Sequence, residues 1–161
     1  MSAPAASAVQ TTQVYQLFIK ASPERIWEAI TNPEQVARYF YGALFEGPPV
    51  VGGRWRARTL DHSQLLNDGE IFELDPPRKF VHGWKALYDP EMAAEVESRI
   101  TWEIEPQDGG YSKLTLIHDR LEASPKTALS VSGGWMLILS GLKSLIETGE
   151  PLIDFTKGEA T

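Results

Sequence analysis

The chain has 161 residues, 42% of them hydrophobic and 23% charged, a balance that suits one ordinary globular domain. Its 15 basic and 22 acidic residues give a net charge of −7, which argues against nucleic-acid binding and against attraction to an anionic membrane surface. Because cysteine is absent, disulfides, thiol chemistry and thiolate metal sites are excluded, and the composition suits a reducing compartment such as the cytoplasm.

The two ends of the chain are expected to be flexible tails, at residues 1–12 and 151–161, around a single domain over 13–150. Within the second tail, Leu152, Ile153 and Phe155 are apolar enough to dock on the domain. The opening residues lack the basic start and apolar stretch of a signal peptide, and no run approaches the roughly 20 apolar residues of a membrane span.

The first regular elements are a strand at 14–19 and two short helices after it. Ser22 precedes Pro23 and Asn32 precedes Pro33, so each pair places a capping side chain before a residue suited to the first helical position. The aromatic segment 39–41, Tyr-Phe-Tyr, then forms either the rim of a pocket or an exposed contact for a partner.

The middle of the chain predicts four strands, near 54–59, 70–74, 80–84 and 100–104, and a returning strand after a hairpin turn at 107–110. Segment 61–68 is expected to be a polar loop and 89–95 an acidic connection. Alternation leaves Arg54, Arg56 and Arg58 in solvent or, alternatively, as a docking patch for an acidic partner. The inward positions of the strands are Trp55, Ala57, Thr59, Glu70, Phe72, Leu74, Phe80, His82, Trp84, Ile100, Trp102, Ile104, Leu114, Leu116 and His118.

A long amphipathic helix is predicted over 131–147, where Trp135 and Leu139 belong to an apolar series at three- and four-residue intervals. Gly149 stands where a helix-ending glycine belongs, and Pro151 lies just beyond. Neither such a helix nor a row of hairpins can bury its apolar face alone. The expected architecture is therefore α+β, with the helix packed across a curved antiparallel sheet.

The terminal segment 131–149 closely resembles the last helix of bacterial AHSA1-like proteins, which belong to the START/Bet v 1-like (SRPBCC) superfamily. Further similarities occur in the expected order over about 14–149, at segments 22–27, 49–53, 75–78 and 114–118. The resemblance implies a helix-grip fold, in which a curved sheet wraps the C-terminal helix and often leaves a cavity. Eukaryotic members bind Hsp90 and stimulate its ATPase, whereas other relatives bind lipids, hormones or polyketides, and some are cyclases.

The inward aromatic residues either line a pocket for a hydrophobic small molecule or simply fill the core. His82 and His118 are either hydrogen-bonded core histidines or polar contacts for a ligand. No spacing of histidines suggests a metal site and no serine lies in a nucleophile motif, so catalytic residues, metal and cofactor are not predicted. The expected ligand-binding residues are Trp55, Phe72, His82, Trp84, Trp102, His118, Trp135 and Leu139.

The leading functional hypothesis is non-catalytic binding of a hydrophobic small molecule between the sheet and the C-terminal helix. One alternative is a surface interaction with an Hsp90-type chaperone, which the resemblance and the arginine row suggest. The other is an enzyme of the cyclase or hydratase kind, which would use Glu70, His82 and His118 for acid–base chemistry. A homodimer is a further possibility that the superfamily suggests.

Overall fold

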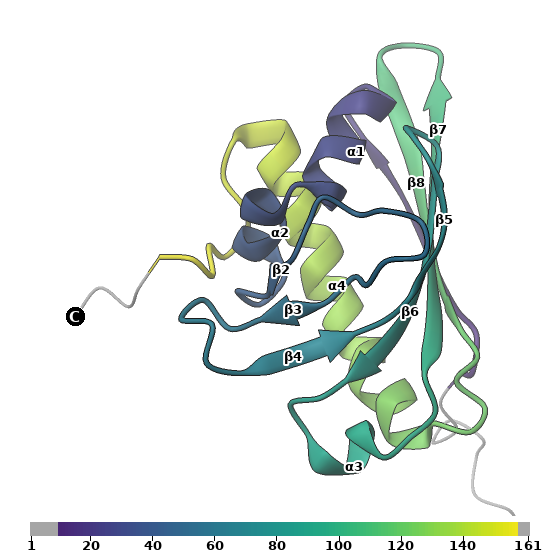
Figure 1. Cartoon of the computed structure of the whole chain (residues 1–161). Coiled ribbons are helices and arrows are strands. Elements are labelled where there is room, and N and C mark those ends of the chain that lie inside the picture. The colour runs from purple at the N-terminus through teal and green to yellow at the C-terminus, as the bar shows by residue number, and fades with distance from the viewer. Residues whose placement is uncertain (1–9, 158–161) are drawn as a thin grey trace, which may run out of the picture.

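A computed structural model describes residues 10–157 and arranges them as a curved antiparallel sheet with helices on one side (Figure 1). The strand order is β1-β8-β7-β6-β4-β3-β2, and β5 pairs with β6 beside this path. The strands are β1 (Gln13–Ile19), β2 (Leu44–Phe45), β3 (Ala57–Arg58), β4 (Leu65–Asp68), β5 (Ile71–Asp75), β6 (Lys79–Ala86), β7 (Ser98–Gln107) and β8 (Tyr111–Asp119). The helices are α1 (Pro23–Thr31), α2 (Pro33–Tyr39), α3 (Pro90–Ala93) and α4 (Pro125–Thr148).

The two short helices begin where the capping pattern predicts. Ser22 Oγ accepts a hydrogen bond from the backbone N–H of Arg25 at 3.2 Å, and Asn32 Oδ1 accepts one from Glu34 at 3.0 Å. Each bond satisfies one of the free N–H groups at a helix start. Local chemistry is therefore sufficient to place α1 and α2 directly after β1.

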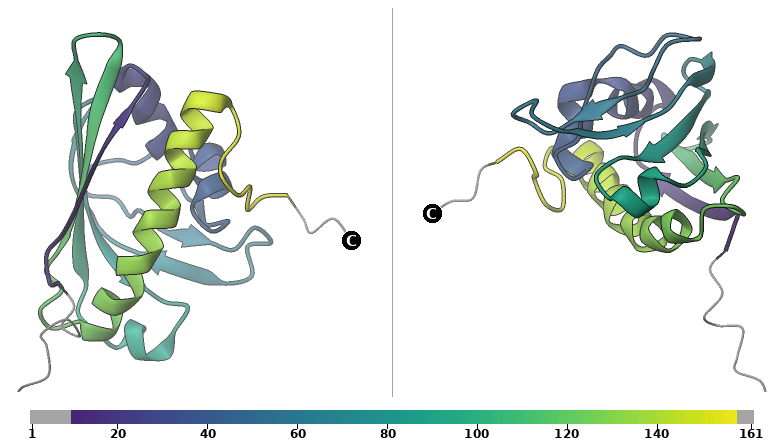
Figure 2. Two further views of the ribbon diagram at one scale, coloured as in Figure 1. Left: turned by 180° about the vertical axis from the view of Figure 1, so that it is seen from behind. Right: turned by 60° about the horizontal axis from the view of Figure 1, so that its bottom comes forward.

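The long helix α4 crosses the concave face of the sheet, and α1 and α2 lie beside it (Figure 2). It starts six residues before the expected position, because Glu95 supplies the cap from a distant loop: its carboxylate accepts from the backbone N–H groups of Lys126 and Thr127 at 3.0 and 2.8 Å. Gly149 ends the helix with φ of 89°, as predicted. The buried face of α4 is Thr127, Ala128, Val131, Trp135, Ile138, Leu139, Gly141, Leu142 and Leu145.

By length and composition alone, α4 is apolar enough to cross a membrane, a property that it shares with the core helices of globular domains. Its contacts are those of a core helix. Trp135 and Leu142 are 2% and 0% exposed, and both belong to the main hydrophobic core with residues of β6, β7 and β8. The apolar face of α4 is therefore covered by the sheet.

Two connecting segments contain regular elements that local composition does not predict. Segment 61–68 is not wholly a loop, since its second half is β4, and segment 89–95 contains α3, which Asp89 caps. Leu65 and Leu66 form the start of a strand only because β3 and β6 lie on either side to pair with it. These elements depend on neighbours distant in the sequence, so local composition does not reveal them.

The described part of the C-terminal segment packs against α2. The backbone N–H of Phe155 donates to the carbonyl oxygen of Arg38 at 2.9 Å, and Arg38 Nε donates to the Asp154 carboxylate at 3.0 Å. The ring of Phe155 lies 5.1 Å from that of Tyr41. Of the three apolar residues proposed to dock, Phe155 does so, whereas Leu152 and Ile153 are exposed. The expected N-terminal tail falls mostly outside the described residues.

Candidate ligand-binding cavity

A cavity of about 460 Å³ lies between the first half of α4 and the arm of the sheet formed by β4 and β6. That volume falls within the range of roughly 300–1,000 Å³ typical of small-molecule sites. No Asp, Glu, His, Lys or Arg is present among the described residues that line it. The lining residues are Phe40, Tyr41, Ala43, Leu66, Asn67, Trp84, Tyr88, Ser130, Val131, Gly134, Trp135 and Ile138.

Small side chains form part of the cavity wall. Gly134 faces it from α4, and a Cβ built on this glycine would lie 3.8 Å from Tyr41 Oη, an ordinary contact distance. Tyr41 and Tyr88 are 48% and 53% exposed, whereas Trp84 and Trp135 are 5% and 2% exposed. The two tyrosines therefore mark the mouth of the cavity and the two tryptophans its interior.

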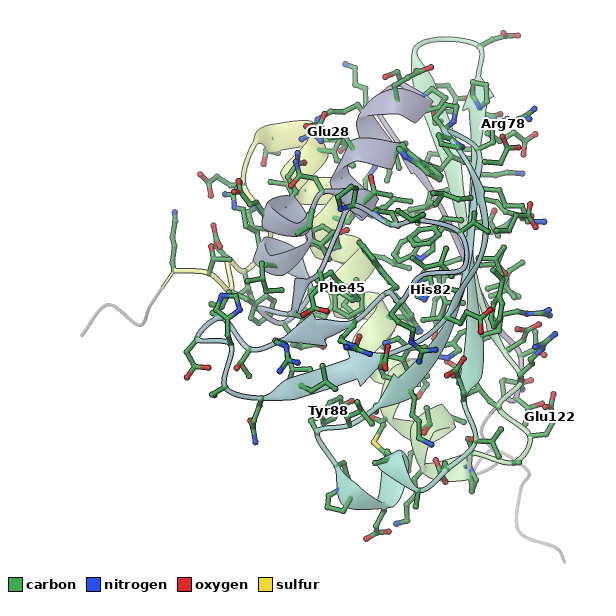
Figure 3. The ribbon with its side chains drawn as sticks, viewed as in Figure 1. Glu28, Phe45, Arg78, His82, Tyr88 and Glu122 are labelled. Atoms are coloured by element: carbon green, nitrogen blue, oxygen red, sulfur yellow. The ribbon has the colours of Figure 1, made fainter. Side chains whose placement is uncertain are left out.

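Burial and the nearby Tyr88 raise the pKa of Tyr41, so its hydroxyl stays neutral at physiological pH. Figure 3 shows Tyr88 beyond the end of β6, near α3. Segment 39–41 was expected to form either the rim of a pocket or an exposed contact for a partner. Phe40 and Tyr41 line the cavity, whereas Tyr39 is buried and its hydroxyl donates to the carbonyl oxygen of Ala29 at 2.8 Å.

Of the eight expected ligand-binding residues, Trp84 and Trp135 line this cavity. Trp55, His82 and Trp102 instead line a second void of only about 10 Å³, too small for more than a water molecule. His118 and Leu139 are buried at 0% and 5% exposure and belong to the lining of neither space. Sequence alternation thus identified most of the inward positions but could not separate cavity wall from filled core.

The expected inward direction of Phe72 was wrong. Its side chain is 43% exposed, while the neighbouring Ile71 is only 1% exposed. The pairing of β5 with β6 shifts register between Ile71 and Glu73, and this irregularity interrupts the alternation that the sequence suggests, so that Ile71 and Leu74, rather than Phe72, pack toward the core. Glu70, expected on the same inward face, is exposed as well, so it does not join the two histidines.

His82 and His118 are core histidines that accept hydrogen bonds from neighbouring tryptophans. Trp102 Nε1 donates to His82 Nε2 at 3.2 Å, and Trp135 Nε1 donates to His118 Nδ1 at 3.0 Å. The remaining ring nitrogens then carry the protons: His82 Nδ1 donates to the Gly83 carbonyl oxygen at 2.8 Å, and His118 Nε2 donates to Ser98 Oγ at 2.7 Å. Figure 3 shows His82 in the interior, beside the sheet.

These bonds hold both imidazoles neutral. Burial lowers the pKa of His82 to about 4 and, together with the nearby His82, that of His118 to about 3. Protonation would also place a ring N–H against an indole N–H in each pair. Neither histidine has a free nitrogen for a substrate, and within residues 10–157 no three His, Asp or Glu side chains gather as a metal site would require.

The arginine row does not form a free basic patch. Arg54 and Arg56 both contact the Asp68 carboxylate, at 3.0 and 3.4 Å, and Arg58 contacts Glu46 at 3.4 Å. These carboxylates of the same chain therefore neutralise much of the charge that an acidic partner would need. The solvent-facing interpretation of these arginines is confirmed by their partial exposure.

The family follows from comparison with known proteins. The model of the family described as Activator of Hsp90 ATPase homolog 1-like protein matches residues 20–147. The chain belongs to this family. As an AHSA1-like protein it shows the fold expected from its terminal helix and from the ordered segments before it. Comparison with curated proteins yields no match.

Solved structures share the fold at low sequence identity. The Aha1 dimer from Colwellia psychrerythraea is 18% identical, with a TM-score of 0.69 over 87% of this chain and 98% of that one. PFC0360w, an HSP90 activator from Plasmodium falciparum, is 24% identical, with a TM-score of 0.67 over 88% and 99%. CalU16 from Micromonospora echinospora is 21% identical, with a TM-score of 0.67 over 87% and 76%. At these identities the likeness concerns the fold alone.

Proposed function

We propose that this AHSA1-like domain binds a hydrophobic small molecule, without catalysis, in the cavity between α4 and the β4–β6 arm. The observation that supports the proposal best is the cavity itself: about 460 Å³ of space with aromatic and aliphatic walls. Each Å² of apolar ligand surface removed from water contributes about 25 cal/mol, so a ligand of modest size reaches micromolar affinity. The cytoplasm is the proposed compartment, consistent with a sequence that has no cysteine.

A substitution at the cavity mouth tests this proposal. Gly134→Leu should weaken binding of the neutral fluorescent probe N-phenyl-1-naphthylamine at least about 10-fold, because the new side chain extends into the space that the probe occupies. Fluorescence titration measures the effect. Gly133→Leu is the matched control, since a Cβ on Gly133 meets no heavy atom within 4 Å and this glycine does not line the cavity. Equal affinities for both variants and the unchanged protein would exclude this cavity as the binding site.

A chaperone interaction is the second candidate, and the family supports it. The family is named for activation of the Hsp90 ATPase, and the Plasmodium falciparum structure is of an HSP90 activator. The pairing of Arg54, Arg56 and Arg58 with carboxylates of the same chain weighs against the arginine row as the docking surface. The test is the rate of ATP hydrolysis by the host's Hsp90, measured with and without this protein. An unchanged rate and the absence of a complex would exclude the chaperone interaction.

The remaining expectations receive less support. An acid–base enzyme built on Glu70, His82 and His118 is disfavoured, because the glutamate is exposed and the two imidazoles are fully engaged. A homodimer is proposed only by analogy with the Colwellia psychrerythraea structure, which is of a dimer. Sedimentation equilibrium of the full chain measures the state directly.

A further inference from the structure

Two polar groups in the cavity wall lack partners within the described chain. They are Nε1 of Trp84, a hydrogen-bond donor, and Oδ1 of Asn67, an acceptor. Both residues are almost fully buried, at 5% and 3% exposure, so water does not freely solvate them. A buried polar group without a partner destabilises a protein, and such groups in native structures call for an explanation.

The two groups belong to the same face of the sheet. Asn67 of β4 pairs with Ala86 of β6, and Trp84 lies two residues before Ala86, so the side chains are diagonal neighbours across the two strands. The cross-strand partners of Asn67 on both sides are alanines, Ala57 and Ala86. An alanine side chain offers no hydrogen bond, so neither cross-strand partner satisfies the Asn67 amide.

The contrast with the other buried indoles is informative. Trp102 and Trp135 each donate to a histidine nitrogen that the fold places beside them. Trp84 packs edge-on against His118, with ring centres 5.7 Å apart, but that histidine is already bonded to Trp135 and Ser98. The fold thus satisfies two indole N–H groups and leaves the third, that of the cavity-lining Trp84, without a partner among the described residues.

We infer that the ligand is an uncharged, mostly apolar molecule whose single hydroxyl group bonds to Trp84 Nε1 and to the side-chain amide of Asn67. A hydroxyl both accepts and donates, so one oxygen serves both groups, and it suits either orientation of the amide. This inference rests on the proposed function, because it names the chemistry of the molecule bound in the same cavity.

The rest of the lining excludes a charged ligand. Its described residues include no basic or acidic side chain, and the hydroxyl of Tyr41 at the mouth is neutral. An ionised group in such a site would lose its hydration without gaining a counter-charge. The hydroxyl therefore belongs at the inner end of the ligand, and the apolar body lies along Val131, Trp135 and Ile138 of α4.

Paired ligands that differ only in the hydroxyl test the inference. We expect 1-naphthol to bind about 10-fold more tightly than naphthalene, and 4-hydroxybiphenyl more tightly than biphenyl, as measured by displacement of N-phenyl-1-naphthylamine. Trp84→Phe keeps an aromatic ring but removes the N–H, and Asn67→Leu keeps the approximate size but removes the amide. Each variant should lose most of the preference for the hydroxylated ligand while still binding the hydrocarbon.

The outcomes separate this inference from the proposed function. If the unchanged protein binds each hydroxylated ligand and its parent hydrocarbon with equal affinity, the hydroxyl inference is overturned and the cavity remains a hydrophobic site. A preference that survives in both variants would also overturn it, because other groups would then recognise the oxygen. If no ligand of either pair binds, the proposed function fails together with the inference. Retained hydrocarbon binding shows that each variant is folded.

Discussion

Between pH 8 and pH 5 the free energy of unfolding should fall by about 4 kcal/mol, as the two buried histidines resist protonation. In the folded chain the pKa of His82 is about 4 and that of His118 about 3, against 6.5 for an ordinary histidine. Below pH 6.5 these two histidines bind protons in the unfolded chain but not in the folded chain, so the free energy of unfolding decreases as the pH is lowered. Each histidine contributes roughly 2 kcal/mol of this loss at pH 5.

The direction and the window follow from the lowered pKa values. The stabilisation that depends on neutral histidines is fully present above about pH 7.5. It decreases as the pH falls through 6.5 and is lost by about pH 4 for His82 and about pH 3 for His118. Urea unfolding at a series of pH values measures it. His82→Gln should roughly halve the slope between pH 6.5 and 5, whereas His62→Gln removes an exposed histidine and should leave the slope unchanged. A stability that stays flat from pH 8 to 5 would contradict the neutral histidines.

Gly69→Ala should destabilise the domain by more than about 3 kcal/mol. A Cβ on Gly69 would overlap the carbonyl group of Gly83, and this neighbour is backbone, so no side chain can move aside. This close approach brings the β4–β5 connection, which contains Gly69, against β6. The carbonyl oxygen of Gly69 also accepts a hydrogen bond from the backbone N–H of Trp55 at 2.8 Å. The two strands carry Asn67 and Trp84, so the same change should distort the cavity wall.

Chemical denaturation compares this variant with Gly133→Ala. A Cβ on Gly133 meets no heavy atom within 4 Å, and alanine favours a helix over glycine by about 0.5–1 kcal/mol. The control should therefore become slightly more stable while Gly69→Ala loses most of its stability. A Gly69→Ala protein as stable as the unchanged one would mean that β4 does not approach β6 this closely.

The parts of the fold that the sequence predicts are those that local chemistry decides. Ser22 and Asn32 start α1 and α2, and Gly149 ends α4, because each residue acts on its own helix terminus. The inward sides of β7 and β8 follow from alternation because these strands pair without interruption. The start of α4 escapes prediction, since its cap, Glu95, is distant in the sequence.

The sequence predicts a cavity between the sheet and the C-terminal helix, but not which residues line it. The tryptophans were expected inside, yet only tertiary packing decides that Trp84 and Trp135 face open space while Trp102 faces His82. Asn67 was missed because its strand lies within a segment that looks like a polar loop. The two leucines before it were the available signal, and its burial comes from β3 and β6 on either side.

A crystal structure of the protein grown with 1-naphthol tests the account most directly. We expect the naphthalene rings between α4 and β6, and the hydroxyl oxygen within about 3.2 Å of both Trp84 Nε1 and the Asn67 amide. Side chains that close the space completely, with naphthol absent from it or held elsewhere on the surface, would contradict the claim that this fold encloses a site for a hydrophobic molecule.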